Sequence, residues 1–192
     1  MLARRVVTCA AVLALSACVA DSLKPHEYLD EKTAATVTVV AKPLVFAHER
    51  PELAAHSREY VTLAATALNK GGAIDFYLFA YFWSTLDRRN APSGAPVGDE
   101  ITIVADDRQL RPQLEGHSLQ EAGVGTAVAA PPGNQWAVHV YRSDLPTLHF
   151  LSEARQIRVI TRSPPDGPVT YEVWKDERES LKALVRRLEG QD

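Results

Sequence analysis

The feature that most limits what this chain can fold into is a pair of long apolar runs joined by a glycine turn. Residues 60–68 alternate, so that apolar side chains at every second position share one face of an extended strand. Residues 69–72 (Asn-Lys-Gly-Gly) tolerate the positive φ angles of a tight hairpin. Residues 74–86 are largely apolar at both odd and even positions. We therefore predict a β-hairpin whose second strand lies inside a sheet that is covered on both faces.

Further short runs of β-branched and aromatic residues, separated by turn residues, are typical of an antiparallel β protein. Pro43 lies between two of these runs, and because proline has no amide proton, we expect an edge strand or a bulge there. Residues 115–134 hold few bulky apolar side chains and form the longest expected loop. The other runs expected to be strands are 36–41, 44–47, 101–105, 109–114, 136–141, 157–161 and 169–174.

Two segments have the spacing of helices. Ser143 is expected to cap a short helix that ends at Leu151. Near the end of the chain, Asp176 and Glu179 stand at the spacing of a capping box, and Gly190 is a stop signal. Between them lies an apolar stripe of Leu181, Leu184, Val185 and Leu188.

These patterns together predict a mainly β fold, an antiparallel β-sandwich with a C-terminal α-helix. An immunoglobulin-like arrangement is one form that such a sandwich can take. The cysteine–tryptophan–cysteine pattern of true immunoglobulin domains does not occur in this sequence, so the strand order stays open.

The N-terminal residues have the three parts of a secretory signal. Arg4 and Arg5 make a positive start, residues 6–15 are mostly apolar, and small residues precede Cys18. The apolar run is too short to span a bilayer, which takes roughly 20 residues. The tetrapeptide at 15–18 (Leu-Ser-Ala-Cys) resembles the lipobox of bacterial lipoproteins.

The lipobox resemblance implies a signal peptide at 1–17, an acylated Cys18, a lipidated N-terminus and tether at 18–32, and a folded domain at 33–192. The lipid bilayer would then be held through the acyl chains on Cys18. Val19, where an aspartate would favour retention in the inner membrane, favours the outer membrane, with the domain facing the periplasm. The alternative is an ordinary signal peptide that leaves Cys18 as a free thiol.

Composition excludes several classes of function. Loss of Arg4 and Arg5 with the signal changes the formal charge from −3 to about −5, which gives no electrostatic basis for binding nucleic acid. Cys9 leaves with the signal and Cys18 is acylated, so neither a disulfide nor a thiol ligand is expected. We expect no cofactor.

Metal binding and catalysis have little support in the sequence. None of the six histidines stands in a recognised zinc pattern, so we expect no metal site, although His139 and His149 could meet in space. Asp106 and Asp107 are better explained by a turn than by calcium ligation. Ser84 lacks the flanking glycines of hydrolases, and its hydroxyl is expected to bond at a sheet edge. We therefore expect a protein that is not an enzyme.

The aromatic strand carries one sharper hypothesis. Exposed rings of Tyr77, Tyr81 and Trp83, with Arg88 and Arg89 at the rim, would form a partner-binding surface. The alternative is that these rings are the core of the domain. Residues 36–89 resemble uncharacterised proteobacterial lipoproteins, and that resemblance brings no functional residues.

The function expected from the sequence is therefore that of a non-enzymatic, membrane-anchored cell-envelope lipoprotein that contacts another envelope protein. The alternative is a periplasmic lipoprotein that binds a small ligand or a metal in a pocket under the 115–135 loop. A hydrolase is a third hypothesis.

Overall fold

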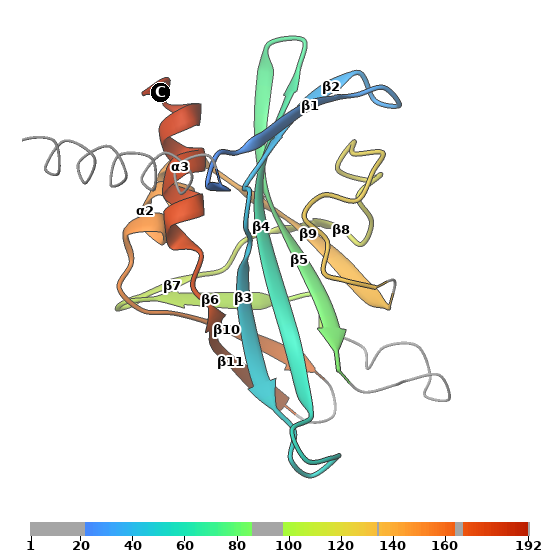
Figure 1. The fold of residues 1–192 in the computed structure, drawn as a ribbon, viewed down its shortest axis with the longest axis vertical. Helices are drawn as coiled ribbons and strands as arrows, with labels where there is room; N and C mark the ends of the chain where they lie inside the picture. Colours follow the sequence, from blue (N-terminus) through green and yellow to red (C-terminus); the bar gives the residue numbers. More distant parts are fainter. Residues whose placement is uncertain (1–21, 86–97, 134, 164–166, 192) are drawn as a thin grey trace, which may run out of the picture.

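The computed structural model describes residues 22–85, 98–133, 135–163 and 167–191. The described part is mainly β and ends in a helix, as predicted (Figure 1). The helices are α2 (Leu145–Glu153) and α3 (Arg178–Leu188). The strands are β1 (His26–Asp30), β2 (Ala35–Val39), β3 (Leu44–Glu49), β4 (Arg58–Lys70), β5 (Ala73–Ser84), β6 (Ile101–Ala105), β7 (Arg108–Leu110), β8 (Leu114–Gly116), β9 (Trp136–Ser143), β10 (Ile157–Ser163) and β11 (Gly167–Lys175).

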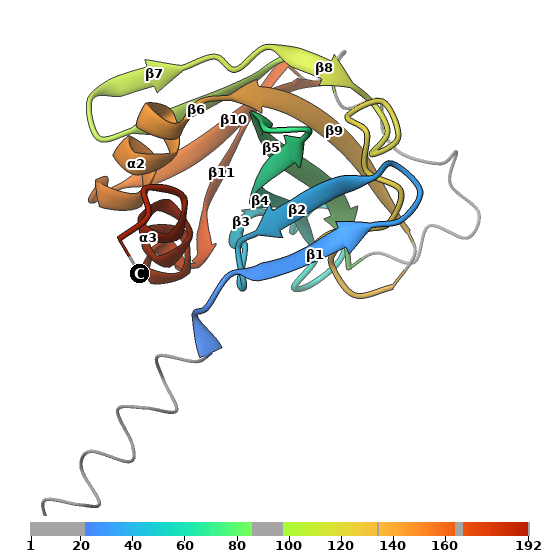
Figure 2. The same cartoon turned by 90° about the horizontal axis from the view of Figure 1, so that it is seen from above.

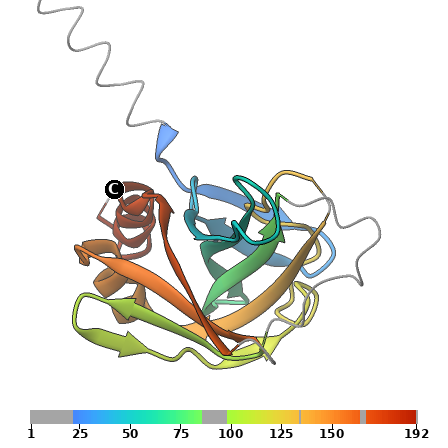
Figure 3. The ribbon, with the colours of Figure 1, turned by 90° about the horizontal axis from the view of Figure 1, so that it is seen from below.

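All the described strands belong to one antiparallel sheet. Its main order is β7-β6-β10-β11-β3-β4-β5-β9-β8, and β2 and β1 branch from β4. The β-sandwich, including its immunoglobulin-like form, is not confirmed, because a sandwich needs two sheets packed face to face. Seen from either end, the sheet instead curls round a common interior, with the two helices together at one side (Figures 2 and 3).

The curvature of the sheet brings its first and last strands, β7 and β8, close together. β7 and β8 are the outermost strands, yet only residues 111–113 separate them in the chain. Leu110 and Leu114 are therefore at most about 14 Å apart. The sequence predicted one return strand broken at Pro112; the break is real, but its two halves lie at opposite ends of the order. This short link requires strong curvature of the sheet.

The predicted hairpin is the longest pairing in the structure. β4 and β5 pair from Glu59 with Ser84 to Lys70 with Ala73. Gly71 and Gly72 form the turn with φ angles of +60° and +92°, and the Gly72 N–H donates to Asn69 Oδ1 at 3.0 Å. β5 lies between β4 and β9 and is buried on both faces from residue 77 to residue 82, as predicted.

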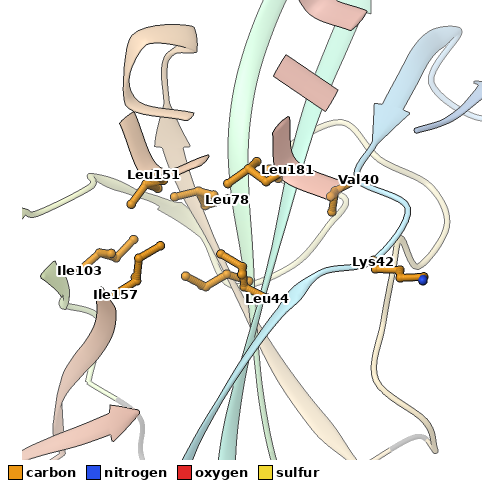
Figure 4. A pocket seen from close by; sticks show the side chains of 10 residues that line it. Val40, Lys42, Leu44, Leu78, Ile103, Leu151, Ile157 and Leu181 are labelled. Atoms are coloured by element: carbon orange, nitrogen blue, oxygen red, sulfur yellow. The ribbon is translucent and has the colours of Figure 1, made fainter. Parts of the chain in front are cut away.

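The two faces of this hairpin have different covers. On the inner face, Leu63 and Leu78 point toward α2, α3, β6 and β10. The side chains there leave a void of only about 10 Å³ (Figure 4), at the lower limit of the roughly 10–15 Å³ that a cavity needs to hold a single water. On the outer face, residues 117–133 pack their apolar side chains against β5. The interior is thus closed by side chains at this position, without room for a ligand.

The strand beside β4 is broken at residues 40–43. β2 pairs with the end of β4 near Leu68, whereas β3 pairs with the end near Val61. The predicted interruption at Pro43 is confirmed. Of the two predicted alternatives, the edge strand is wrong, because β3 lies between β4 and β11 and β2 lies between β4 and β1. The other alternative, a bulge, agrees with the register, because residues 40–43 stand opposite only residues 64–65 of β4. The sheet therefore divides into two branches at this proline.

Helix α3 lies against the break in the strand. Ser180 is fully buried, and its Oγ accepts the backbone N–H of Lys42 at 2.9 Å. The predicted apolar stripe is confirmed, with Leu181, Leu184 and Val185 buried and Leu188 partly buried. Gly190 ends the helix with a φ of +72°, as its position predicted. The amphipathic helix thus supplies both apolar cover and a hydrogen-bond acceptor.

The starts of both helices differ from the prediction. α2 is capped by Asp144, whose carboxylate accepts the Thr147 N–H at 2.7 Å, and not by Ser143. α3 has no capping box, because Glu177 is the N-cap and makes no side-chain hydrogen bond there. Asp176 instead binds the guanidinium of Arg178 and also accepts the backbone N–H of that residue, the first of the helix, at 3.3 Å.

The folded part begins before residue 33. β1 pairs with β2 along its whole length. Buried Asp30 accepts backbone N–H groups from Gly125 and Lys32, and the Gly125 bond is the main cause that lowers the pKa of this carboxyl. The expected tether at 18–32 is therefore too long, because its second half is a strand joined to the 117–133 segment.

The contact between α3 and the broken strand gives a first prediction. Ser180→Ala removes the acceptor of the Lys42 N–H, so we expect a loss of about 1 kcal/mol in the free energy of unfolding. Urea denaturation followed by circular dichroism measures it. Arg186→Ala, at an exposed position of the same helix, is the control and should change stability by less than about 0.5 kcal/mol. Equal midpoints for the two variants would contradict the role given to Ser180.

Candidate functional site

Two of the predicted partner-binding residues lie inside the protein. Tyr77 is buried and Tyr81 is fully buried, so neither ring is available at the surface of this structure. The hydroxyl of Tyr81 donates to the Val128 carbonyl at 2.6 Å, and burial raises the pKa of Tyr81 to about 12. The 117–133 segment covers Tyr81, because Val128 of this segment is buried and accepts the Tyr81 hydrogen bond. The pocket expected under this loop is likewise filled, around Tyr81, by Val128 and its neighbours.

Three other predicted residues cannot be placed. Cys18, Arg88 and Arg89 lie outside the described residues. The lipidation site and the arginine rim of the expected surface therefore remain predictions from the sequence.

Trp83 is different, because it belongs to a partly exposed group of rings. Its indole stacks on Tyr60 with ring centroids 4.2 Å apart, and its Nε1 donates to Thr62 Oγ1 at 3.0 Å. Tyr60 also meets Trp174 edge-on at 6.2 Å. The guanidinium of Arg58 lies 4.5 Å from the centre of the Trp174 ring, a cation–π distance. We call Arg58, Tyr60, Trp83 and Trp174 the Trp174 patch.

A β-bulge presents Trp174 to solvent. Val173 pairs with Phe46 and Lys175 pairs with Val45, so Trp174 is the extra residue in β11. A bulge interrupts the strict alternation of a strand and can redirect a side chain. Here the consecutive residues Val173 and Trp174 are 39% and 49% exposed. The sequence did carry a signal, since Trp174 falls in phase with the polar residues Thr170 and Glu172.

Charged side chains lie at the Arg58 end of the Trp174 patch. Arg58 pairs with Glu49 at 3.0 Å while its guanidinium lies over the Trp174 ring, so both signs of charge occur beside that ring. The hydroxyl of Ser84 donates to the Arg58 carbonyl at 3.0 Å. Ser84 was expected to bond at a sheet edge, but this bond joins the ends of two interior strands, β5 and β4.

A second cluster joins residues that the sequence did not connect. Asp99 precedes β6, His117 follows β8, and His139 lies in β9. One potential ligand atom from each lies within 4.8 Å of the others. His117 Nε2 is 2.8 Å from Asp99 Oδ1, and the two imidazole rings are 4.8 Å apart and nearly perpendicular. We call these three residues the histidine cluster.

The position of His139 corrects two expectations. The alternation of β9 predicted an outward side chain, but the ring is buried beside Phe82, at a centroid distance of 5.1 Å. Both faces of β9 are covered, so alternation alone could not tell which one meets solvent. His149, the predicted neighbour, is exposed on α2 and is not part of the cluster.

Tyr141 determines which nitrogen of His139 is available. The Tyr141 hydroxyl donates its one proton to the Asp99 carbonyl at 3.0 Å. At 3.2 Å from His139 Nδ1, its oxygen can then only accept, which places the imidazole proton on Nδ1. Nε2 of His139 is thereby left with a lone pair, the form in which a histidine binds a metal.

The protonation states in the histidine cluster favour metal binding by two imidazoles and one carboxylate. Burial lowers the pKa of His139, and the nearby His117 lowers it further, so its ring is neutral. The hydrogen bond from His117 lowers the pKa of the Asp99 carboxyl, which is therefore ionised. Glu121 accepts the backbone N–H of His117 at 2.7 Å and fixes the loop that carries it. Two imidazoles and one carboxylate thus converge from three separate segments.

No protein-family model, no curated protein and no solved structure matches this chain. Among the described residues, no helix is both long enough and apolar enough to cross a membrane. Inference about function therefore depends on the chemistry of the Trp174 patch, the histidine cluster and the N-terminal sequence.

The burial of the tyrosines gives a second prediction. Tyr81→Phe leaves the buried Val128 carbonyl without its donor, so we expect the protein to lose about 1 kcal/mol of stability. Tyr28→Phe is the matched control, because it removes a more exposed hydroxyl contact, to Thr126. Guanidinium unfolding measures both. A Tyr81 variant that is no less stable than the Tyr28 variant would argue against the core role of Tyr81.

Proposed function

We propose that this protein is a lipid-anchored protein of the bacterial cell envelope that acts by binding another envelope protein and not by catalysis. The Trp174 patch is the observation that carries the partner proposal. The anchor proposal is supported by the lipobox resemblance at 15–18, with Cys18 as the acylated residue and the outer membrane as the favoured location.

The residue types in the Trp174 patch are those that dominate protein interfaces. Tryptophan, tyrosine and arginine are the residues most enriched among binding hot spots. Tyr60 is buried and contacts the indoles of both Trp83 and Trp174. Because these contacts already restrict the two indoles, they lose little side-chain freedom when a partner covers them. The Arg58–Glu49 ion pair borders the Trp174 ring, as in the polar rim of an interface. These properties fit a folded protein surface as the partner.

The short anchor supports a partner close to the membrane. Seven residues, 19–25, separate Cys18 from the start of β1 at His26, a reach of at most about 28 Å. With Cys18 in the bilayer, the domain would stay near the membrane surface. Arg88 and Arg89, which follow Trp83 in the sequence, remain in the proposal as rim residues.

A second candidate function is a periplasmic metal-binding lipoprotein. The convergence of Asp99, His117 and His139 favours it. The expected site under the 115–135 loop does not support it, because apolar side chains of that loop pack on the sheet.

The partner proposal gives a third prediction. Trp174→Ala should reduce recovery of the partner at least tenfold, because truncation of a hot-spot residue costs about 2 kcal/mol or more of binding. The full lipoprotein is released gently from its own membrane, and native mass spectrometry measures the added mass. Arg88→Glu with Arg89→Glu should weaken the same complex with little change in the melting temperature.

Ile74→Ala is the matched control for the Trp174 variant. Ile74 is also 49% exposed, but it lies beside the hairpin turn at the other end of β5. An equal loss of partner in both variants, or no protein mass bound to the wild type, would contradict the proposal. A bound mass equal to a second copy of the chain would identify self-association in place of a separate partner.

The anchor gives a fourth prediction. Cys18→Ser removes the acyl acceptor, so the protein should move from the membrane fraction to the soluble fraction, since the acyl chains provide the attachment. Fractionation and immunoblotting measure this distribution, and the intact mass of the wild type reports the lipid. Retention of the Cys18 variant in the membrane fraction at the wild-type level would contradict lipid anchoring.

A further inference from the structure

We propose that Asp99, His117 and His139 bind one divalent transition-metal ion, with Zn²⁺ as the preferred ion, and leave its fourth coordination position to water. This inference deepens the second candidate function and does not depend on the Trp174 patch. Two imidazole nitrogens and one carboxylate oxygen are a known zinc donor set when one position stays open.

The geometry requires only small movements. Ligand atoms about 2.0–2.1 Å from a tetrahedral zinc are separated by roughly 3.4 Å. In the structure one atom pair is 2.8 Å apart, and all three candidate atoms lie within 4.8 Å of one another. The side chains of His117 and Asp99 are 54% and 64% exposed, so they can turn about their own bonds. His139 is buried in β9 and supplies the fixed position.

The surroundings of the fixed ligand resemble the support that metal sites require. A histidine ligand usually donates its second ring N–H to an oxygen, which fixes its tautomer. Nδ1 of His139 has that oxygen in the Tyr141 hydroxyl, and Tyr141 is fully buried. Tyr141 also contacts the Asp99 carbonyl, so one side chain positions two of the three ligands. Glu121 places the third ligand through the His117 backbone.

The donor types select the class of ion. Ca²⁺ requires six or more oxygen ligands, and Mg²⁺ prefers oxygen in an octahedron, so two imidazoles disfavour both. Imidazole nitrogens suit zinc, copper and nickel, and no cysteine belongs to this cluster. Zinc has no geometric preference from its d electrons and accepts three protein ligands with one open position.

A simple ion pair between His117 and Asp99 is the alternative explanation of the contact. Exposed pairs contribute at most about 1 kcal/mol. Such a pair would not explain why a third potential donor, the buried His139, has its ring 4.8 Å from the His117 ring in the same cluster. The two explanations differ in one measurable property, which is stoichiometric metal binding.

The test uses the full lipidated protein in detergent, carrying an affinity tag without histidine and stripped of metal by a chelator. Titration calorimetry with ZnCl₂ should show one equivalent bound. Co²⁺ should give visible absorption bands typical of a four-coordinate site, and Zn²⁺ should abolish them. His117→Ala should lower the affinity by on the order of 100-fold or more, as loss of a direct ligand should exceed the 10–100-fold cost of losing a supporting residue.

Further variants serve as controls for the metal-binding test. His149→Ala removes an exposed histidine outside the cluster and should bind zinc like the wild type. If His139→Ala does not fold, Asp99→Ala with His117→Ala decides, because both side chains are exposed. Trp174→Ala should keep zinc binding, and His117→Ala should keep the partner, so failure of one proposal is distinguishable from failure of the other. Absence of stoichiometric Zn²⁺ binding, or an unchanged affinity in His117→Ala, would overturn the metal site.

Discussion

The break in the chain at Lys42 and Pro43 is the constraint on which the rest of the architecture depends. Pro43 has no N–H to give to a neighbouring strand, so one continuous partner for β4 cannot form. β2 therefore continues toward β1 and β3 toward β11, and the sheet divides. The amide of Lys42 finds its acceptor in Ser180, which ties α3 to the division. The sheet thus branches at the proline, and the amide before it is tied to the C-terminal helix.

The branched, curled sheet also decides which residues can reach solvent. β5 is central and covered by helices on the inner face and by residues 117–133 on the outer face. Its aromatic side chains between 77 and 82 are therefore core, and only the end at Trp83 joins a partly exposed group. Trp174 reaches that group because a bulge interrupts the alternation of β11. The Trp174 patch thus lies where regular strand pairing stops.

The sequence predicted the features of the fold that depend on residues close together in the chain. The turn at Gly71 and Gly72, the central place of β5 and the stripe on α3 depend on near neighbours, and each was confirmed. The single sheet could not be predicted, because alternation shows which residues face inward but not which strands pair. β11 joins β3, for example, from more than a hundred residues away. The histidine cluster was missed for the same reason, since its three residues come from separate segments.

The Trp174 patch and the histidine cluster lie on opposite faces of the sheet, on different strands. Phe82 contacts His139 on the inner face, and Trp83, the next residue of β5, stacks on Tyr60 on the outer face. The pairing of β4, β5 and β9 fixes both positions through backbone hydrogen bonds. A metal in the cluster would therefore hold segments near Asp99 and His117 without moving the Trp174 ring. Because neither site needs the other's side chains, metal binding and partner binding should be separable by mutation.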